Sequence, residues 1–219
     1  MTRRVVFIGL CCAVLPGLHL TAQEGILRYV ETHGQRSRIL EYGVTRSAGG
    51  IDVTSMGGGL ANRLRWVPVT GTVAWQQTDA EAGTDIRAER TQNTIRVTGR
   101  LKGKEVTREI HVDAAPWYQV FGPIIGELLP AGSDWREFWV VNPNDLSAHK
   151  MLARRAGSER IEINGALIDT FKIHFSPAGA LAPFWGADFW YRPSDAAYLF
   201  SRLPESDALT ITTIMGSGK

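Results

Sequence analysis

The chain has 219 residues, 44% of them hydrophobic, and its 24 basic and 22 acidic side chains give a formal net charge of +2. This near-neutral balance lacks the strong positive charge of a nucleic-acid-binding protein, so nucleic acid is not expected as a partner. The length and hydrophobic content fit one domain with an ordinary core, and two packed subdomains are the alternative.

Residues 1–22 have the three-part order of a secretory signal peptide. Arg3 and Arg4 supply the positive start, Val5–Leu15 forms the apolar run, and cleavage is expected after Ala22. The apolar run is shorter than the roughly 20 residues that a membrane-spanning helix needs, so no transmembrane anchor is expected after cleavage. The sequence therefore predicts a periplasmic or secreted protein.

The mature chain, residues 23–219, is expected to be a single antiparallel β domain. The leader contains both cysteines and two arginines, so the mature chain has 24 − 2 = 22 basic residues against 22 acidic ones and no possible disulfide. A lipoprotein signal at Cys11 is disfavoured because the residues before it are not consistently small. Twin-arginine export is a further alternative, although the run after Arg4 is strongly apolar.

Alternation of apolar and polar residues, interrupted by glycine and asparagine, predicts strands joined by tight turns. The clearest turns are Lys102-Gly103-Lys104 and Asn164-Gly165, the second being a strong two-residue signal. About ten to twelve strands are expected from the alternating segments. The candidates for these strands are fourteen alternating segments: Gly25–His33, Gln35–Thr45, Ile51–Met56, Arg63–Val69, Thr72–Gln77, Thr94–Leu101, Glu105–Val112, Glu137–Val141, Leu146–Arg154, Glu159–Ile163, Leu167–Phe175, Asp188–Tyr191, Ala197–Leu203 and Leu209–Ile214.

One segment, Trp117–Leu129, has apolar residues too dense for a strand and predicts a short helix, with Pro123 in its first turn. A sheet of so many strands curls because strand twist accumulates. The sequence thus predicts a mainly β fold: a curved antiparallel half-barrel with the one helix on its concave side.

No pattern in the sequence predicts catalysis, a metal site or a cofactor. The mature histidines His33, His111, His149 and His174 are not within metal-ligand spacing of one another, and no Gly-x-Ser-x-Gly motif is present. The terminal Gly-Ser-Gly-Lys lacks the following helix that a phosphate-binding loop requires.

The densest chemical signal is the aromatic run from Phe184 to Asp195. Tryptophan and tyrosine bury a large area and keep one polar group, which suits either a β core or a pocket for a lipid or sugar. Both interpretations stay open, and a hydrophobic core explains the run at least as well. If the run forms a ligand wall, the expected binding residues are Trp185, Asp188, Trp190, Arg192 and Asp195.

Residues 161–195 carry a resemblance to a known group of proteins. Gly165 leads into Asp169-Thr170-Phe171-Lys172, and Trp190 opens the sequence Trp-Tyr-Arg-Pro-Ser-Asp. This arrangement resembles the C-terminal half of uncharacterised bacterial periplasmic proteins. The resemblance implies a β half-barrel similar in shape to the LolA and LolB lipoprotein carriers, with no agreed activity. The pattern usually has glycine where this chain has Ala196, which leaves the turn type open.

Three hypotheses for function follow. The leading one is a non-catalytic periplasmic binding module whose curved sheet shelters a lipid or another apolar small molecule. The second is a cell-envelope interaction module that docks another protein without a small ligand. The third is a hydrolase of envelope glycans or esters, in which Asp188 and Asp195 would be the first catalytic candidates.

Overall fold

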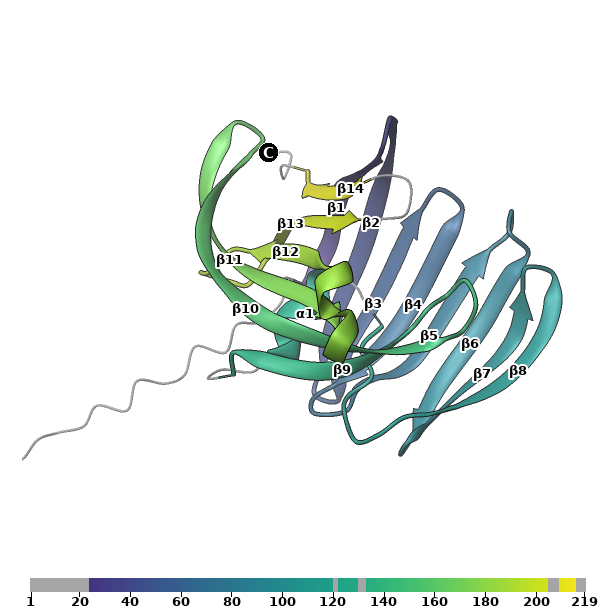
Figure 1. The fold of residues 1–219 in the computed structure, drawn as a ribbon. Helices are drawn as coiled ribbons and strands as arrows, with labels where there is room; N and C mark the ends of the chain where they lie inside the picture. Colours follow the sequence, from purple (N-terminus) through teal and green to yellow (C-terminus); the bar gives the residue numbers. More distant parts are fainter. Residues whose placement is uncertain (1–23, 120–121, 130–132, 205–208, 216–219) are drawn as a thin grey trace, which may run out of the picture.

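The computed structural model describes residues 24–119, 122–129, 133–204 and 209–215, and it is dominated by one antiparallel sheet (Figure 1). The first eight strands are β1 (Gly25–His33), β2 (Arg36–Ser47), β3 (Gly50–Gly57), β4 (Leu60–Val67), β5 (Gly71–Asp79), β6 (Thr84–Thr91), β7 (Thr94–Leu101) and β8 (Lys104–His111). The remaining six are β9 (Trp135–Val141), β10 (Ala148–Ile163), β11 (Ala166–Pro177), β12 (Ala187–Tyr191), β13 (Tyr198–Pro204) and β14 (Leu209–Ile214).

The first and last strands meet in the middle of the sheet. β1 pairs with β14 from Tyr29 opposite Ile214 to His33 opposite Thr210. The strand order is β8-β7-β6-β5-β4-β3-β2-β1-β14-β13-β12-β11-β10-β9, so two strands that are consecutive along the chain, β8 and β9, form the edges. The predicted mainly β fold with a curved, unclosed antiparallel sheet is confirmed, with fourteen strands instead of ten to twelve.

Two strand predictions were wrong in detail. β6 was not expected, because Ile86 and Ala88 are its only inward apolar side chains and charged residues alternate with them. Leu146–Arg154 and Glu159–Ile163 were expected as separate strands but form one strand, β10. A register shift between Arg155 and Ser158 bends β10 there, and Gly157 adopts φ 95°, so the strand continues through a bulge.

Tight turns fix the register of the hairpins as expected. Asn164 and Gly165 have φ values of 52° and 78°, and Lys102 and Gly103 have 51° and 79°. Two successive positive φ values give a turn whose twist matches that of the flanking strands. The long β10–β11 hairpin curves around one side of the molecule, opposite the wall formed by the earlier strands (Figure 1).

The segment between β8 and β9 crosses the concave side of the sheet. Trp117 lies in an extended conformation between β5 and β9. The Thr72 N–H donates to the Trp117 carbonyl and the Tyr118 N–H donates to the Trp139 carbonyl, each with an N–O distance of 2.7 Å. The bond from Tyr118 satisfies a backbone carbonyl of β9 on the side of that strand that would otherwise be a free sheet edge.

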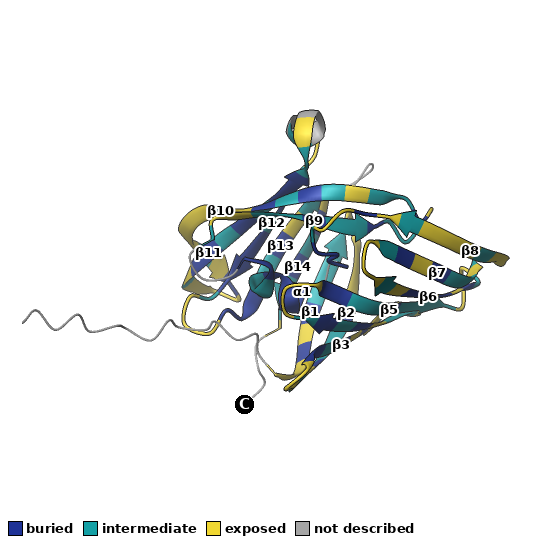
Figure 2. Cartoon of the chain, turned by 90° about the horizontal axis from the view of Figure 1, so that it is seen from below, coloured by how far each residue is buried: buried dark blue, intermediate teal, exposed yellow. Residues whose placement is uncertain are grey.

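The predicted helix is present but shorter than Trp117–Leu129. It consists of α1 (Gly122–Ile125) and a 3₁₀ turn, η1 (Gly126–Leu128), and Pro123 lies in the first turn as expected. The prediction was wrong at Trp117 and Tyr118, because their backbone groups bond to strands. Figure 2 shows α1 within the buried interior, and its apolar side chains are fully buried. Its place on the concave side is confirmed.

Aromatic rings in contact fill the concave side. Successive ring centroids lie 4.9–6.3 Å apart, within the range of favourable edge-to-face and tilted pairs. Because Tyr118 belongs to the crossing segment, that segment is part of the core that holds both halves of the sheet together. The series runs Trp66, Tyr118, Phe138, Phe175, Phe189, Tyr198, Tyr29 and Tyr42.

A polar cluster joins the end of β8 to β9 and β10. The Asp113 carboxylate accepts hydrogen bonds from Lys150 Nζ at 2.7 Å and from Trp139 Nε1 at 2.8 Å. Arg90 donates to the carbonyls of Asp113 and Ala115 from the other side. These hydrogen bonds hold the pKa of Asp113 well below its usual range, and the bond from Lys150 contributes more than the bond from Trp139. We call Asp113, Trp139 and Lys150 the Asp113 latch.

Replacing Gly122 with alanine should destabilise the fold. A Cβ at Gly122 would lie 2.3 Å from the Tyr198 ring, and the Gly122 carbonyl accepts the Tyr191 hydroxyl hydrogen bond at 2.8 Å. We expect Gly122→Ala to lower the free energy of unfolding by about 1–3 kcal/mol, as overpacking typically does. Urea denaturation measures this loss. Gly126→Ala is the matched control, since its nearest neighbour would be 3.8 Å away; an equal loss in both variants would contradict the packing argument.

The Asp113 latch should make stability depend on acid pH. Because the folded-state pKa of Asp113 is depressed, its contribution is complete above about pH 5 and is lost as the pH falls below the carboxyl group's ordinary pKa. Between pH 5 and pH 3 the urea midpoint of the wild type should therefore fall more steeply than that of Asp113→Asn. The exposed Asp169, paired with Arg160, provides the control: Asp169→Asn should keep the wild-type slope.

Candidate functional site

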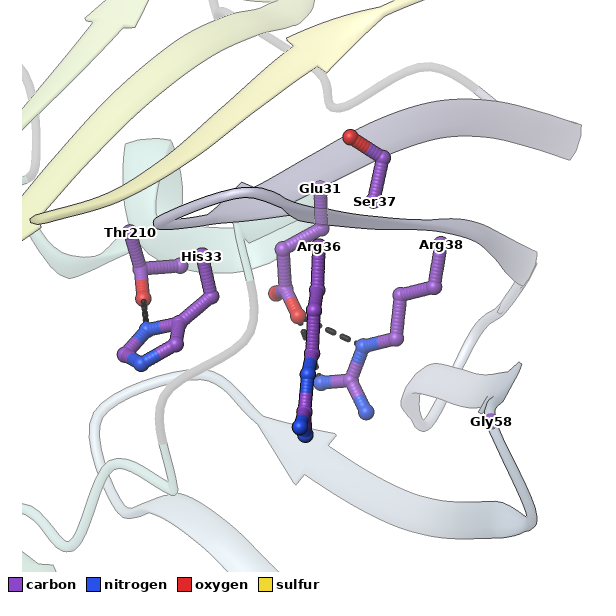
Figure 3. A pocket seen from close by; sticks show the side chains of 7 residues that line it. All are labelled: Glu31, His33, Arg36, Ser37, Arg38, Gly58 and Thr210. Carbon is purple, nitrogen blue, oxygen red and sulfur yellow. Dashed lines mark hydrogen bonds and ion pairs between the residues drawn. The ribbon is translucent and has the colours of Figure 1, made fainter. Parts of the chain in front are cut away.

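A hollow of about 460 Å³, open to solvent, lies at one end of the concave face (Figure 3). We call it the mouth pocket. The end of β1, the start of β2, the β3–β4 turn and β14 contribute its walls. Its lining residues are Glu31, His33, Arg36, Ser37, Arg38, Gly58 and Thr210.

Strand alternation explains why charged side chains point into the mouth pocket. Tyr29 is fully buried in the core, and Glu31 and His33 follow it on the same face of β1. In the β1–β2 register Glu31 is opposite Arg38 and His33 is opposite Arg36. The inward face is thus apolar in the middle of the sheet and becomes charged towards the hairpin end.

The contacts within the mouth pocket leave one cation unmatched. Arg38 Nε donates to Glu31 Oε1 at 2.6 Å, and Arg38 Nη2 lies 2.5 Å from the same oxygen. His33 Nδ1 and Thr210 Oγ1 are hydrogen-bonded at 2.9 Å. Arg36 has no hydrogen-bond or ion-pair partner among the residues that the structure describes. Figure 3 shows its side chain extending to the same side of the hairpin as those of Glu31 and Arg38.

The inner wall next to the mouth pocket consists of neutral polar groups. The Tyr198 hydroxyl donates to Ser201 Oγ at 2.7 Å, and Thr210 and Thr212 are buried on the inner face of β14. Burial raises the pKa of Tyr198 and of Tyr42 far above the usual range, so both phenols stay neutral. The charge of the mouth pocket therefore comes from Arg36, Arg38 and Glu31.

The sequence analysis did not identify this site. It considered His33 only as a possible metal ligand and did not single out Glu31, Arg36 or Arg38. A signal exists: the four charged or titratable residues flank Gly34 at alternate positions, in phase with buried Tyr29. Its meaning depends on knowing which face of the hairpin is concave.

The predicted binding residue Trp190 lies on the outer face of β12, opposite the inward Phe189 and Tyr191. Its ring is only 4% exposed, because Phe200 packs against it at 5.1 Å and Lys172 and Arg202 lie over it. Trp190 Nε1 donates to Glu159 at 2.8 Å, and this bond is the main reason that the pKa of Glu159 is lowered.

Asp188 and Trp185 lie near the other end of β12. Asp188 Oδ1 lies 2.7 Å from His174 Nδ1, within hydrogen-bond distance, on the same outer face as Trp190. Trp185 precedes the strand, is 37% exposed, and donates to the Pro204 carbonyl at 3.0 Å. Asp188 and Trp190 therefore share a face, whereas Trp185 lies outside the strand.

Arg192 and Asp195 form the β12–β13 turn. Arg192 Nε lies 3.0 Å from Asp195 Oδ1, and the same oxygen accepts the Ala197 N–H at 3.1 Å. Ala196 has a φ of 50°, in the left-handed region that favours glycine. The turn at Ala196 thus needs a positive φ, a conformation that glycine adopts more readily than alanine.

Within the described parts of the chain, no three His, Cys, Asp or Glu side chains gather closely enough to hold a metal ion. None of the helices in these described parts is long and apolar enough to cross a membrane. The mouth pocket offers hydrogen-bond donors and positive charge, which suit the binding of a polar or anionic group.

The two candidate tryptophans should differ in their effect on stability. Trp190→Ala removes a ring that is nearly fully buried and should cost about 3–5 kcal/mol of unfolding free energy. Trp185→Ala removes a partly exposed ring and one hydrogen bond, and should cost about 1 kcal/mol. Urea denaturation of both variants compares them; a small loss for Trp190→Ala would show that its ring does not act as packing.

Comparisons with known proteins give a likeness of fold. No family model and no curated protein matches the chain. Among solved structures, a β-barrel-like protein of the domain of unknown function DUF1849 from Brucella abortus matches with a TM-score of 0.54 and 10% identity, over 90% of this chain and 100% of that one.

Two further solved structures match less closely. The hypothetical lipoprotein YmcC from Escherichia coli covers 91% of this chain and 88% of its own, with 12% identity and a TM-score of 0.37. LprF from Mycobacterium bovis covers 88% and 85%, with 12% identity and a TM-score of 0.29. At this level of superposition only the Brucella structure bears on the fold. The chain thus shares the β-barrel-like architecture of an uncharacterised domain, in line with the resemblance of residues 161–195.

Proposed function

We propose that this protein is an exported, non-catalytic binding module that holds a lipid or other amphipathic molecule with its polar end in the mouth pocket. The observation that carries the proposal is the mouth pocket itself. It is a concave hollow placed where the aromatic core ends, and its Arg36 has no partner among the described residues.

Location is part of the same proposal. Residues 1–22 act as a cleaved leader and residues 23–219 as the mature domain, which places the protein in the periplasm or outside the cell. The leader lies outside the described residues. Support comes from the two arginines and the apolar run of the leader.

The core restricts where an acyl chain could lie. The rings next to the mouth pocket, Tyr29, Tyr42 and Tyr198, pack against one another at centroid distances of 5.0 and 5.4 Å. An acyl chain would therefore enter the interior only if the crossing segment or these rings moved. Movement of the crossing segment would have to break the Asp113 latch and the backbone hydrogen bonds of Trp117 and Tyr118 to β5 and β9.

Docking to another envelope protein is the second candidate function. Phe184 is 82% exposed and Trp135 is 60% exposed, which is unusual for rings of this size. The hydrolase hypothesis has less support. Asp188 and Asp195 each already bind a neighbouring cationic or titratable side chain, and neither lines the mouth pocket.

Native mass spectrometry of protein purified gently from a cell envelope tests the proposal. We expect a bound species of lipid mass at one per chain, which should return when urea-refolded, lipid-free protein is mixed with envelope lipid vesicles. The refolded protein before lipid addition is the control. Absence of lipid in both preparations would contradict the proposal. A reproducible cross-linked protein neighbour that is lost in Phe184→Ala, without bound lipid, would favour docking.

A further inference from the structure

The geometry points to a phosphate group as the chemistry recognised in the mouth pocket, with Arg36 as its primary contact and Arg38 as its second. This inference rests on the proposed function and names the polar end of the ligand. The phosphate could belong to a lipid head group or be free in solution.

Charge balance is the first argument. Two arginines line the mouth pocket against one glutamate, and Arg36 has no partner among the described residues. Elsewhere on the concave side the inward Arg46 forms an ion pair with Glu127, with Nη2 2.6 Å from Oε1, so the charge of that arginine is balanced by a carboxylate. An unmatched guanidinium in a concavity produces a local positive potential that attracts an anion.

Donor geometry is the second argument. Arg36 and Arg38 are two residues apart on β2, so their side chains leave the same face about 7 Å apart along the strand. Guanidinium groups present planar pairs of N–H donors that match phosphate oxygens. Two such groups entering one hollow from one strand can hold different oxygens of the same phosphate.

The His33–Thr210 pair lies across the hairpin end from these arginines and offers further polar contacts on β1 and β14. Neutral Tyr42 and Tyr198 behind the mouth pocket add no negative charge that would oppose an anion. Behind the two arginines the wall is thus polar, and Glu31 is its acidic group.

Glu31 gives the inference its sharpest test. Its carboxylate holds Arg38 in the empty pocket and would repel an incoming phosphate. Binding must therefore compete with the Glu31–Arg38 ion pair. Neutralising Glu31 should release Arg38 and strengthen binding, whereas removing Arg36 should weaken it.

The experiment measures binding of inorganic phosphate to the full mature chain by calorimetry, and binding to phosphatidylglycerol or phosphatidylcholine vesicles by flotation. Arg36→Ala should reduce affinity at least about tenfold, the amount expected for one charge-assisted hydrogen bond. Glu31→Gln should increase affinity. Arg96→Ala, which removes an exposed arginine from the outer face of β7, is the matched control and should change neither measurement.

Either probe can support the inference, and the two together identify the source. Arg36-dependent binding of inorganic phosphate indicates a free anion, and Arg36-dependent binding to phosphatidylglycerol vesicles alone indicates a lipid head group. Equal effects of Arg36→Ala and Arg96→Ala, or weaker binding in Glu31→Gln, would overturn the inference. A co-purifying lipid whose retention ignores Arg36 would overturn it while leaving the proposed function intact. Phosphate binding without any bound lipid would do the reverse.

Discussion

The segment between β8 and β9 is the part of the molecule on which the rest depends. A curved sheet with two free edges would leave its concave side exposed, because apolar side chains there need a second layer to cover them. Here the chain supplies that layer itself. Trp117 bonds to β5 and β9, Tyr118 completes the series of rings, and α1 is buried beneath Tyr191 and Tyr198.

This arrangement also determines where a ligand can bind. The interior is occupied wherever the crossing segment and the aromatic rings meet, and the mouth pocket opens towards the β1–β2 hairpin. At that end the inward residues change from tyrosine and leucine to glutamate, histidine and arginine. The outer face of β10–β13 differs: its aromatic and charged side chains bind one another, as Trp190 does with Glu159.

Much of the fold could be predicted from local patterns, and the site could not. Alternation and the Asn164-Gly165 turn act over a few residues, so they identify hairpins directly. The extended Trp117-Tyr118 pair was misassigned to a helix because its conformation depends on strands distant in sequence. The mouth pocket depends on contacts such as that between His33 and Thr210, which are 177 positions apart. Charged residues at a hairpin end otherwise look like an ordinary solvated surface.

The pairing of β1 with β14 has a consequence for folding. Every other strand pair in the sheet joins neighbours along the chain, so β1–β8 and β9–β14 can each form as a series of consecutive hairpins through contacts of short range. The β1–β14 pair alone closes a loop of nearly the whole domain, and it does so at the centre of the sheet. Until residues 209–214 are available, β1 and β13 both present unsatisfied edges that invite association with other chains. Cooperative folding, and protection from aggregation, therefore depend on β14.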